Sequence, residues 1–398
     1  MKTFFFLLII LVFSIIILTG CGEIYQLNEL AIITALGIDL SDEGYLITAQ
    51  IINPGEIVKE KATSKTSVTT YRTYGKTIFE ALRRLQLEIP RRIYFAHLRV
   101  LVYGEELART EGIGKTLDLI SRDHEMRTDF YIVIAKDTKA EKLLNILTPL
   151  EEIPSNKIFS GINMSEELWA ATHQVQLDEL INNIASHEKE PVVPGIILKG
   201  NADKGMDISN LEKVDVPTTV QIRYFSVFKN DKLIGWLSEE ESIGYNHITG
   251  GVKSTIVTVP WEDGKISIEL TKTDSTITGK VKNQKPIIEI EYWVEGNVGE
   301  LECDIELSNT DKIYELEKLI EKEIKKNMKE TIIKVQADFE SDIFGFGEAI
   351  HRSEPEAWKK LKIEWDKEFV DLEVDVQVTA KIRGSGKIIE SFQSEFSK

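Results

Sequence analysis

The sequence contains little cysteine and few basic residues. Cys21 and Cys303 are its only two cysteines among 398 residues. Lysine and arginine number 48 against 65 acidic residues, which gives a formal net charge of −17. This acidity argues against binding nucleic acid, which selects basic surfaces. It also argues against the protein lying flat on anionic lipid, which attracts Lys and Arg clusters.

The motifs of the common enzyme classes are absent as well. Gly114-Lys115-Thr116 resembles the end of a phosphate-binding loop, but Arg109 stands where that loop needs its first glycine. The six histidines include no close pair with metal-ligand spacing. No Gly-x-Ser-x-Gly nucleophile turn is present. We therefore expect a protein that is not an enzyme and that uses neither a metal nor a cofactor.

The N-terminus has the pattern of an export signal. Lys2 is followed by an apolar run over 4–18, which is shorter than the ~20 residues of a membrane-spanning helix. The run ends in Leu18-Thr19-Gly20-Cys21, which resembles the lipobox of bacterial lipoproteins. That resemblance implies cleavage of a signal peptide over 1–20 and a diacylglyceryl lipid on Cys21. The alternative is an ordinary signal peptide with an incidental cysteine. With Cys21 lipidated, Cys303 has no internal disulfide partner.

The residues after the signal predict a multi-domain fold of mixed α/β or α+β class. An N-terminal domain over 21–199, built of one or two subdomains, alternates strands with helices. Its expected strands are 30–38, 45–52, 94–103, 129–135 and 191–198. Its expected helices are 76–87, 105–120, 139–147 and 165–187, with Asp137-Thr138 as the cap of the third.

A polar stretch over 200–217 indicates a linker to a second domain over 218–398. Short strands then follow at close spacing, which favours an antiparallel sheet. Their expected ranges are 219–228, 232–236, 254–259, 265–271, 277–281, 287–298 and a closing strand over 369–382. Between the last two, apolar residues over 310–335 step by three or four, which predicts one long amphipathic helix.

Three segments together resemble the Ger(x)C family, the lipoprotein C subunits of bacterial spore germinant receptors. They are the lipobox, the segment from Leu27 to Asp39, and Asp342-Ile343-Phe344-Gly345-Phe346-Gly347-Glu348 followed by Trp358-Lys359-Lys360. The resemblance covers nearly the whole chain after the signal. It implies a non-catalytic subunit that assembles with two membrane-embedded subunits, A-type and B-type, at the outer face of the membrane and is needed for germination.

Two local features each have two possible interpretations. The motif of Asp342, Phe344, Gly345, Phe346 and Gly347 is either a surface that contacts a partner subunit or a buried corner between helices, and we favour the corner. Three basic residues either bind an anion or acidic partner or, as we favour, form salt bridges within the fold. These are Arg91, Arg92 and Arg99.

Two rival functions are also considered. A solute-binding lipoprotein of a transporter would show two matching lobes of strand–helix–strand units. A surface hydrolase would need a nucleophile motif, and the sequence shows none.

The linker of 22–26 between Cys21 and the first strand spans at most ~17 Å, so the first domain should lie close to the membrane.

Overall fold

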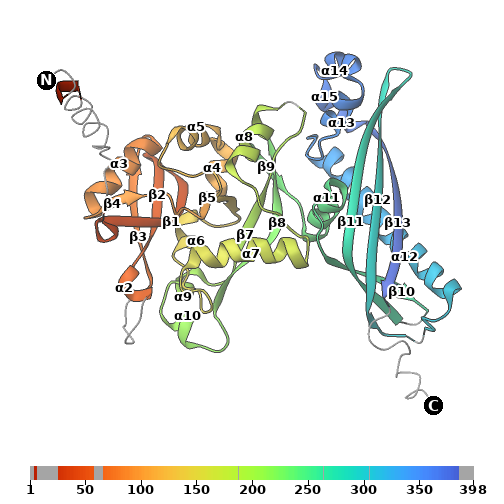
Figure 1. The fold of residues 1–398 in the computed structure, drawn as a ribbon, viewed down its shortest axis with the longest axis horizontal. Coiled ribbons are helices and arrows are strands. Elements are labelled where there is room, and N and C mark those ends of the chain that lie inside the picture. Colours follow the sequence, from red (N-terminus) through yellow and green to blue (C-terminus); the bar gives the residue numbers. More distant parts are fainter. Residues whose placement is uncertain are drawn as a thin grey trace.

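The structure is a computed structural model that describes residues 4–6, 26–57, 66–186, 188–262, 264–303 and 305–384. Two β-sheets follow one another along the long axis of the molecule (Figure 1). Leu18, Thr19, Gly20 and Cys21, the predicted cleavage and lipidation motif, lie outside the described residues.

The first sheet has nine strands, and its centre is parallel. The order is β3-β2-β1-β5-β6-β7-β8-β9, with the short β4 also paired to β1. Strands β1, β5, β6 and β7 run parallel, and antiparallel pairs extend the sheet on both sides. The bounds are β1 Leu30–Ser41, β2 Gly44–Ile52, β3 Val68–Gly75, β4 Arg92–Tyr94, β5 Val100–Gly104, β6 Tyr131–Ala135, β7 Val192–Gly200, β8 Thr218–Lys229 and β9 Lys232–Trp236.

Helices cover both faces of this sheet, so its central strands are apolar on both sides. One core contains residues of α3 (Ile78–Glu88), α4 (Glu105–Thr110), α5 (Gly114–Arg122) and α8 (Leu177–Ala185). The other contains residues of α6 (Ala140–Leu144) and α7 (Pro154–Leu168). The remaining short elements of this unit are η1 (Leu27–Glu29), α2 (Pro54–Ile57), α9 (Ala202–Gly205) and α10 (Ser209–Glu212).

The second sheet is built on one long hairpin. Its order is β10 (Thr255–Trp261), β11 (Gly264–Lys282), β12 (Lys285–Leu301) and β13 (Glu373–Gly384). Asn283 and Gln284 form the hairpin turn with positive φ. The helices that accompany this sheet are α11 (Glu239–Thr249), α12 (Thr310–Asp338), α13 (Phe346–Ser353), α14 (Pro355–Leu361) and α15 (Trp365–Val370).

The long helix is confirmed, and it provides the second core. Leu316, Ile320, Ile324 and Met328 are all buried on one side of α12, as the spacing predicts. Cys303 is buried just after the end of β12, rather than within a strand. The two sheets differ in size and topology, so the matching lobes expected of a solute-binding lipoprotein are not found in the described chain.

Several predicted elements divide in the structure. The helix expected over 165–187 is wrong, because α7 ends at Leu168 and α8 begins only at Leu177. Ala170 adopts a φ of 56°, and the Ser165 carbonyl accepts from both Trp169 N and Ala170 N, which closes α7. The expected strand 94–103 divides into β4 and β5, and the expected helix 105–120 divides into α4 and α5 at Gly112, whose φ is 82°.

The hairpin after the predicted linker belongs to the first sheet and not to the second. β8 pairs with β7 over its length, and Asp231 in the β8–β9 turn holds the start of α5 through Gly114 N, 3.1 Å from Oδ2. The segment 200–217 is itself folded, because Asn210 is fully buried and its Nδ2 donates to the Leu147 carbonyl at 2.7 Å.

The expected antiparallel sheet is found for β10, β11 and β12, and β13 extends it at one edge in parallel. β13 pairs with β12 in parallel, since the chain returns through α12 to α15 before it enters the sheet. Two of the expected strands, 265–271 and 277–281, are parts of the single strand β11. Phe369, expected in the closing strand, lies in α15.

Candidate functional site

The Asp342 motif forms a tight corner between α12 and α13. The carboxylate of Asp342 is 3% exposed, and five N–H groups donate to it. Those on Oδ1 are the backbone N–H groups of Phe344, Gly345 and Phe346, at 3.2, 3.0 and 3.1 Å. Those on Oδ2 are Gly347 N at 2.8 Å and Trp365 Nε1 at 3.1 Å. One side chain thus satisfies the free N–H groups at the start of α13.

The two glycines of the motif have separate steric reasons. Gly345 has a φ of 79°, a left-handed conformation that a side chain would strain. At Gly347 an added Cβ would stand 2.7 Å from the Glu188 carbonyl oxygen and 2.8 Å from the Trp358 ring. The chain of the first unit therefore approaches the start of α13 at a distance that only glycine allows.

The two phenylalanines of the motif face the core. Phe344 and Phe346 are 3% and 0% exposed, and their ring centroids lie 5.0 Å apart. Phe344 also lies 6.0 Å from Tyr245 of α11. A surface that contacts a partner needs exposed side chains, and these are buried. The geometry therefore favours the corner over the contact surface.

This corner is also where the two sheets meet. The backbone N of Glu190 donates to the Asp342 carbonyl at 2.7 Å, and Asn230 N donates to Glu190 Oε2 at 2.6 Å. Ser341 Oγ donates to the carbonyl of Phe228 in β8 at 3.0 Å. Hydrogen bonds at residues 341 and 342 thus fix the helices of the second sheet to β8 and to the segment just before β7 in the first.

The acids at this junction have raised pKa values. Burial raises the pKa of Asp342 to about 6, although the hydrogen bonds from Gly347, Phe346, Trp365 and Gly345 act in the opposite direction. Burial also raises the pKa of half-buried Glu190 to about 7, and the nearby Asp366 and Asp342 add to the effect, while the hydrogen bond from Asn230 opposes it. The junction therefore holds its negative charge at a cost in free energy.

A second buried aspartate also accepts hydrogen bonds from the N–H groups of a helix start, in the first sheet. Asp39 ends the apolar part of β1 and is 2% exposed. Its Oδ1 accepts from Ala140 N at 2.8 Å and its Oδ2 from Glu141 N at 2.9 Å, so it caps α6 from a distant strand. Sequence reasoning missed this role and assigned the cap to Asp137-Thr138, whereas the helix begins after Lys139.

Comparisons with known proteins match both the N-terminal and the C-terminal parts of the chain to one family. Residues 24–198 match the model of the spore germination protein N-terminal domain, and residues 225–386 match the model described as spore germination B3/GerAC like, C-terminal. Spore germination protein KC of Bacillus subtilis (strain 168) is 33% identical over 389 residues, which cover 96% of this chain and 95% of the relative. The chain belongs to the GerAC family of spore germination proteins. The family resemblance found in the sequence is thereby confirmed.

More distant members of the GerAC family align over the same length. Spore germination protein B3 of Bacillus subtilis (strain 168) is 22% identical over 388 residues, 95% of this chain and 97% of that protein. The crystal structure of the GerBC protein superposes with a TM-score of 0.55 over 87% of this chain and 96% of that one, at 20% identity. At this identity the superposition shows the fold, and it confirms the mixed multi-domain architecture. The chain is accordingly a germinant-receptor subunit of the C type that is required for germination.

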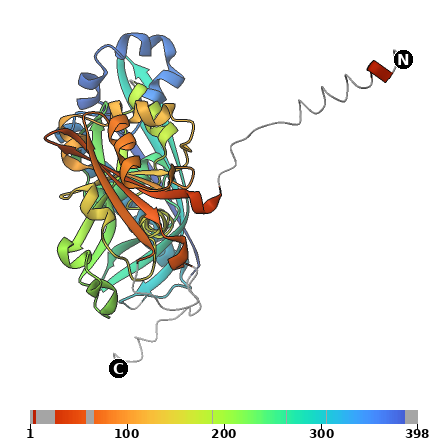
Figure 2. The same cartoon turned by 90° about the vertical axis from the view of Figure 1, so that its left-hand side faces the viewer.

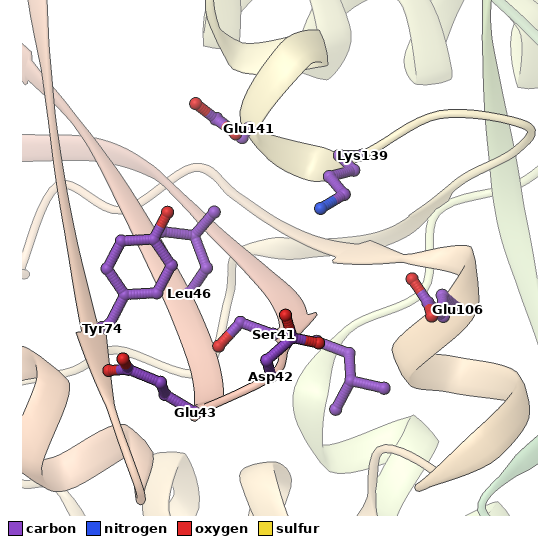
Figure 3. Close-up of a pocket in the computed structure, with 9 residues that line it drawn as sticks. Ser41, Asp42, Glu43, Leu46, Tyr74, Glu106, Lys139 and Glu141 are labelled. Atoms are coloured by element: carbon purple, nitrogen blue, oxygen red, sulfur yellow. The ribbon is translucent and has the colours of Figure 1, made fainter.

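A polar hollow lies beside Asp39 in this GerAC family member. It has a volume of about 420 Å³ at the edge where β1 ends (Figure 3). Asp42, Glu43 and Glu106 line it opposite Lys139, whose amine points into the space. Glu141 also lines it and pairs with Arg72 on β3. Within the described ranges no group of three or more His, Cys, Asp or Glu residues could hold a metal ion.

The described histidines with buried rings serve the core. Nδ1 of His173 lies 3.1 Å from Asn246 Oδ1, and Nδ1 of His247 lies 2.7 Å from the Tyr292 hydroxyl. Burial lowers the pKa of each histidine to about 4, so both rings are neutral at pH 7. They link α11 to its neighbours through these contacts.

Among the described residues, a salt bridge within the fold is found for Arg92 of the three basic residues. Arg92 pairs with Glu125 at 2.8 Å, whereas Arg99 lies over the Phe159 ring at 5.2 Å.

No helix among the described residues is both long enough and apolar enough to cross a membrane.

Proposed function

We propose that this subunit is held at the outer face of the membrane by lipid on Cys21, that it performs no catalysis, and that it assembles with two membrane-embedded subunits, A-type and B-type. The observation that carries the proposal is the lipobox Leu18–Cys21 placed directly before a family match over nearly the whole chain. The match supplies the receptor context, and the lipobox supplies the attachment.

The chemistry of the anchor supports a stable attachment. A single myristoyl chain binds a membrane only marginally, with an association constant of roughly 10⁴ M⁻¹, whereas two or more chains hold a protein stably. A diacylglyceryl cysteine carries two chains. The described fold begins at Gln26, which is at most ~17 Å along the chain from Cys21. The first sheet therefore stays within reach of membrane-embedded partners.

The buried polar groups support a role in assembly rather than in catalysis. Asp39 and Asp342 are buried carboxylates, and backbone N–H groups at helix starts donate to both. A general acid or base must face the substrate in an open site. These two carboxylates face helix ends, and so they are committed to structure.

A cysteine exchange in spores tests the anchor. We expect Cys21→Ala to move the protein from the membrane fraction to the unprocessed or released fraction and to lower nutrient-triggered germination by about tenfold or more, because attachment through two chains is lost. Cys303→Ala is the matched control, since it removes the other thiol, and we expect it to leave membrane fractionation unchanged. A Cys21→Ala protein that fractionates and germinates like the parent would contradict the anchor.

Copurification tests the partners. Full-length protein carrying a C-terminal tag, extracted from spore membranes in mild detergent, should bring down two membrane-embedded subunits. Crosslinks should map to the first sheet, because the tether keeps that sheet near the bilayer. Recovery of the protein alone, or with the subunits of a transporter, would contradict the assembly.

A further inference from the structure

The outer face of α3 has a row of exposed basic and apolar side chains. Two of them, Phe79 and Arg83, line a shallow hollow with residues 123–125. Phe79, Arg83 and Leu87 recur every four residues, and Arg91 follows the helix; we call these four residues the α3 stripe. Phe79 is 52% exposed and Leu87 is 87% exposed. The opposite side of the helix buries Ile78, Ala81 and Leu85 in the core, so the stripe faces away from the fold.

The stripe is positively charged within an acidic protein. Residues 76–92 contain five basic and two acidic side chains, a net charge of +3 in a chain of −17. Arg84 pairs with Glu80 and Arg92 pairs with Glu125. In contrast, neither Arg83 nor Arg91 forms an ion pair with any residue in the described ranges. Arg83 lies 5.0 Å from the centre of the Phe79 ring, so its charge stays exposed beside an apolar surface.

The stripe lies at the end of the first sheet where β1 begins. Leu30, the first residue of β1, is the parallel partner of Arg92 in β4. Gln86 fixes the turn between α3 and β4, because its Nε2 donates to the Arg91 carbonyl at 2.7 Å and its Oε1 accepts from Ile93 N at 3.1 Å. Figure 1 places α3 and β4 at the end of the molecule away from the second sheet. In Figure 2, η1 stands at the side of the first unit and leads into β1.

We infer that the α3 stripe rests on the anionic headgroups of the bilayer and orients the anchored subunit. Each arginine near an anionic surface is attracted by the negative potential, and exposed Phe and Leu side chains enter the boundary between headgroups and acyl chains. The inference rests on the proposed anchor at Cys21. A tether of at most ~17 Å keeps Gln26 near the bilayer, and the β1–β4 pairing carries the stripe with it.

Lipid fits this surface better than an acidic protein does. An acidic protein partner would be recognised by arginines, whereas the stripe also exposes large apolar side chains next to them, and a lipid interface accepts both kinds of side chain. The rest of the acidic surface is repelled by anionic lipid, so one basic face defines a single orientation. The second sheet then points away from the membrane.

A fluorescent probe on the stripe tests the inference in the full-length lipidated protein. Leu87→Cys in a Cys303→Ala background is labelled with a polarity-sensitive dye and reconstituted in vesicles of phosphatidylglycerol and phosphatidylcholine. We expect a blue-shifted emission and quenching of about twofold or more by spin-labelled lipid. The same dye at Val214→Cys, a fully exposed position far along the first unit, should show neither change.

Charge reversal tests the electrostatic part. Arg83→Glu with Arg91→Glu should abolish quenching at position 87, whereas Lys359→Glu with Lys360→Glu on α14 should leave it unchanged. Quenching at position 87 no greater than at position 214 would overturn the inference. So would protection that appears only after membrane-embedded receptor subunits are added, since the stripe would then bind protein. Flotation of the protein with vesicles reports the anchor separately, so a failed anchor and a failed stripe give different results.

Discussion

The two sheets of this protein are each joined to a helix start by one buried aspartate, but the two aspartates work over different distances. Asp39 of the first sheet accepts from Ala140 N and Glu141 N, which lie about a hundred residues further along the chain. Asp342 accepts four backbone N–H groups within the next five residues, and only Trp365 comes from further away.

The two aspartates therefore stabilise different levels of structure. Asp39 fixes a tertiary contact, because β1 and α6 meet only after the sheet has formed. Asp342 shapes its own turn first, and the completed corner then receives Glu190 N on its carbonyl. Asp342 therefore affects both the local conformation and the junction of the sheets, whereas Asp39 affects the packing of one helix on the first sheet.

The largest effect should follow loss of the Asp342 carboxylate. Asp342→Ala leaves four buried backbone N–H groups and the Trp365 indole N–H without acceptors, and each buried unsatisfied group costs about 1–3 kcal/mol before relaxation. Five such groups would cost at least about 5 kcal/mol without relaxation, and we expect relaxation to leave a local loss of about 4 kcal/mol. Hydrogen exchange at the amides of residues 344–347 measures it directly, because local opening can be followed without a two-state assumption.

The amide variant is the matched control for Asp342. Asp342→Asn keeps an acceptor for the three N–H groups on Oδ1 and turns a donor toward Gly347 N and Trp365 Nε1. We expect roughly half of the loss seen with alanine. Exchange at residues 344–347 that stays within about 1 kcal/mol of the parent in Asp342→Ala would show that water or a neighbouring carbonyl replaces the carboxylate.

A smaller effect is expected at Asp39. Asp39→Ala leaves two N–H groups unsatisfied, at a cost of about 2–3 kcal/mol, and exchange at residues 140 and 141 should report it. An added Cβ at Gly104 would stand 2.1 Å from Asp39 Oδ1, so Gly104→Ala should displace the same carboxylate. Because both changes damage one contact, Gly104→Ala should cost less in an Asp39→Ala background. Additive losses would contradict a shared contact.

The contrast between the two aspartates also explains what the sequence could predict. The Asp342 corner was predictable as a turn, because two glycines stand within three residues and every donor is local. The role of Asp39 was not, since nothing in the sequence pairs residue 39 with residue 140. A carboxylate at the end of a wholly apolar run is the available signal, because a buried charge needs a partner.

The same reasoning explains why some predicted ends and partners of strands and helices were wrong. Alternation predicted the 219–236 hairpin but not its sheet, because edge pairing with β7 depends on contacts such as Asp231 to Gly114 N. The helix expected over 165–187 failed because apolar spacing continues across the break at Ala170, whose positive φ is set by packing. Local patterns thus predicted element types, and long-range contacts decided partners and ends.

The smallest effect, and one that tests the junction itself, concerns Glu190. Its pKa in the folded protein, about 7, lies above the ordinary value of 4.5. Stability from this group is therefore full below about pH 4.5 and is lost as pH rises through 7. Glu190→Gln removes the charge and keeps an acceptor for Asn230 N, so we expect the variant to be more stable than the parent by about 1–2 kcal/mol at pH 8, after allowance for partial exposure.

The difference between Glu190→Gln and the parent should vanish near pH 4.5, where the parent side chain is neutral as well. Paired thermal unfolding curves across this range measure it. Glu179→Gln, on α8 outside the junction, is a useful comparison, because burial also raises the pKa of that carboxyl but it accepts no hydrogen bond from the β8–β9 turn. A pH-independent gap between Glu190→Gln and the parent would mean that the junction responds to side-chain shape rather than to charge.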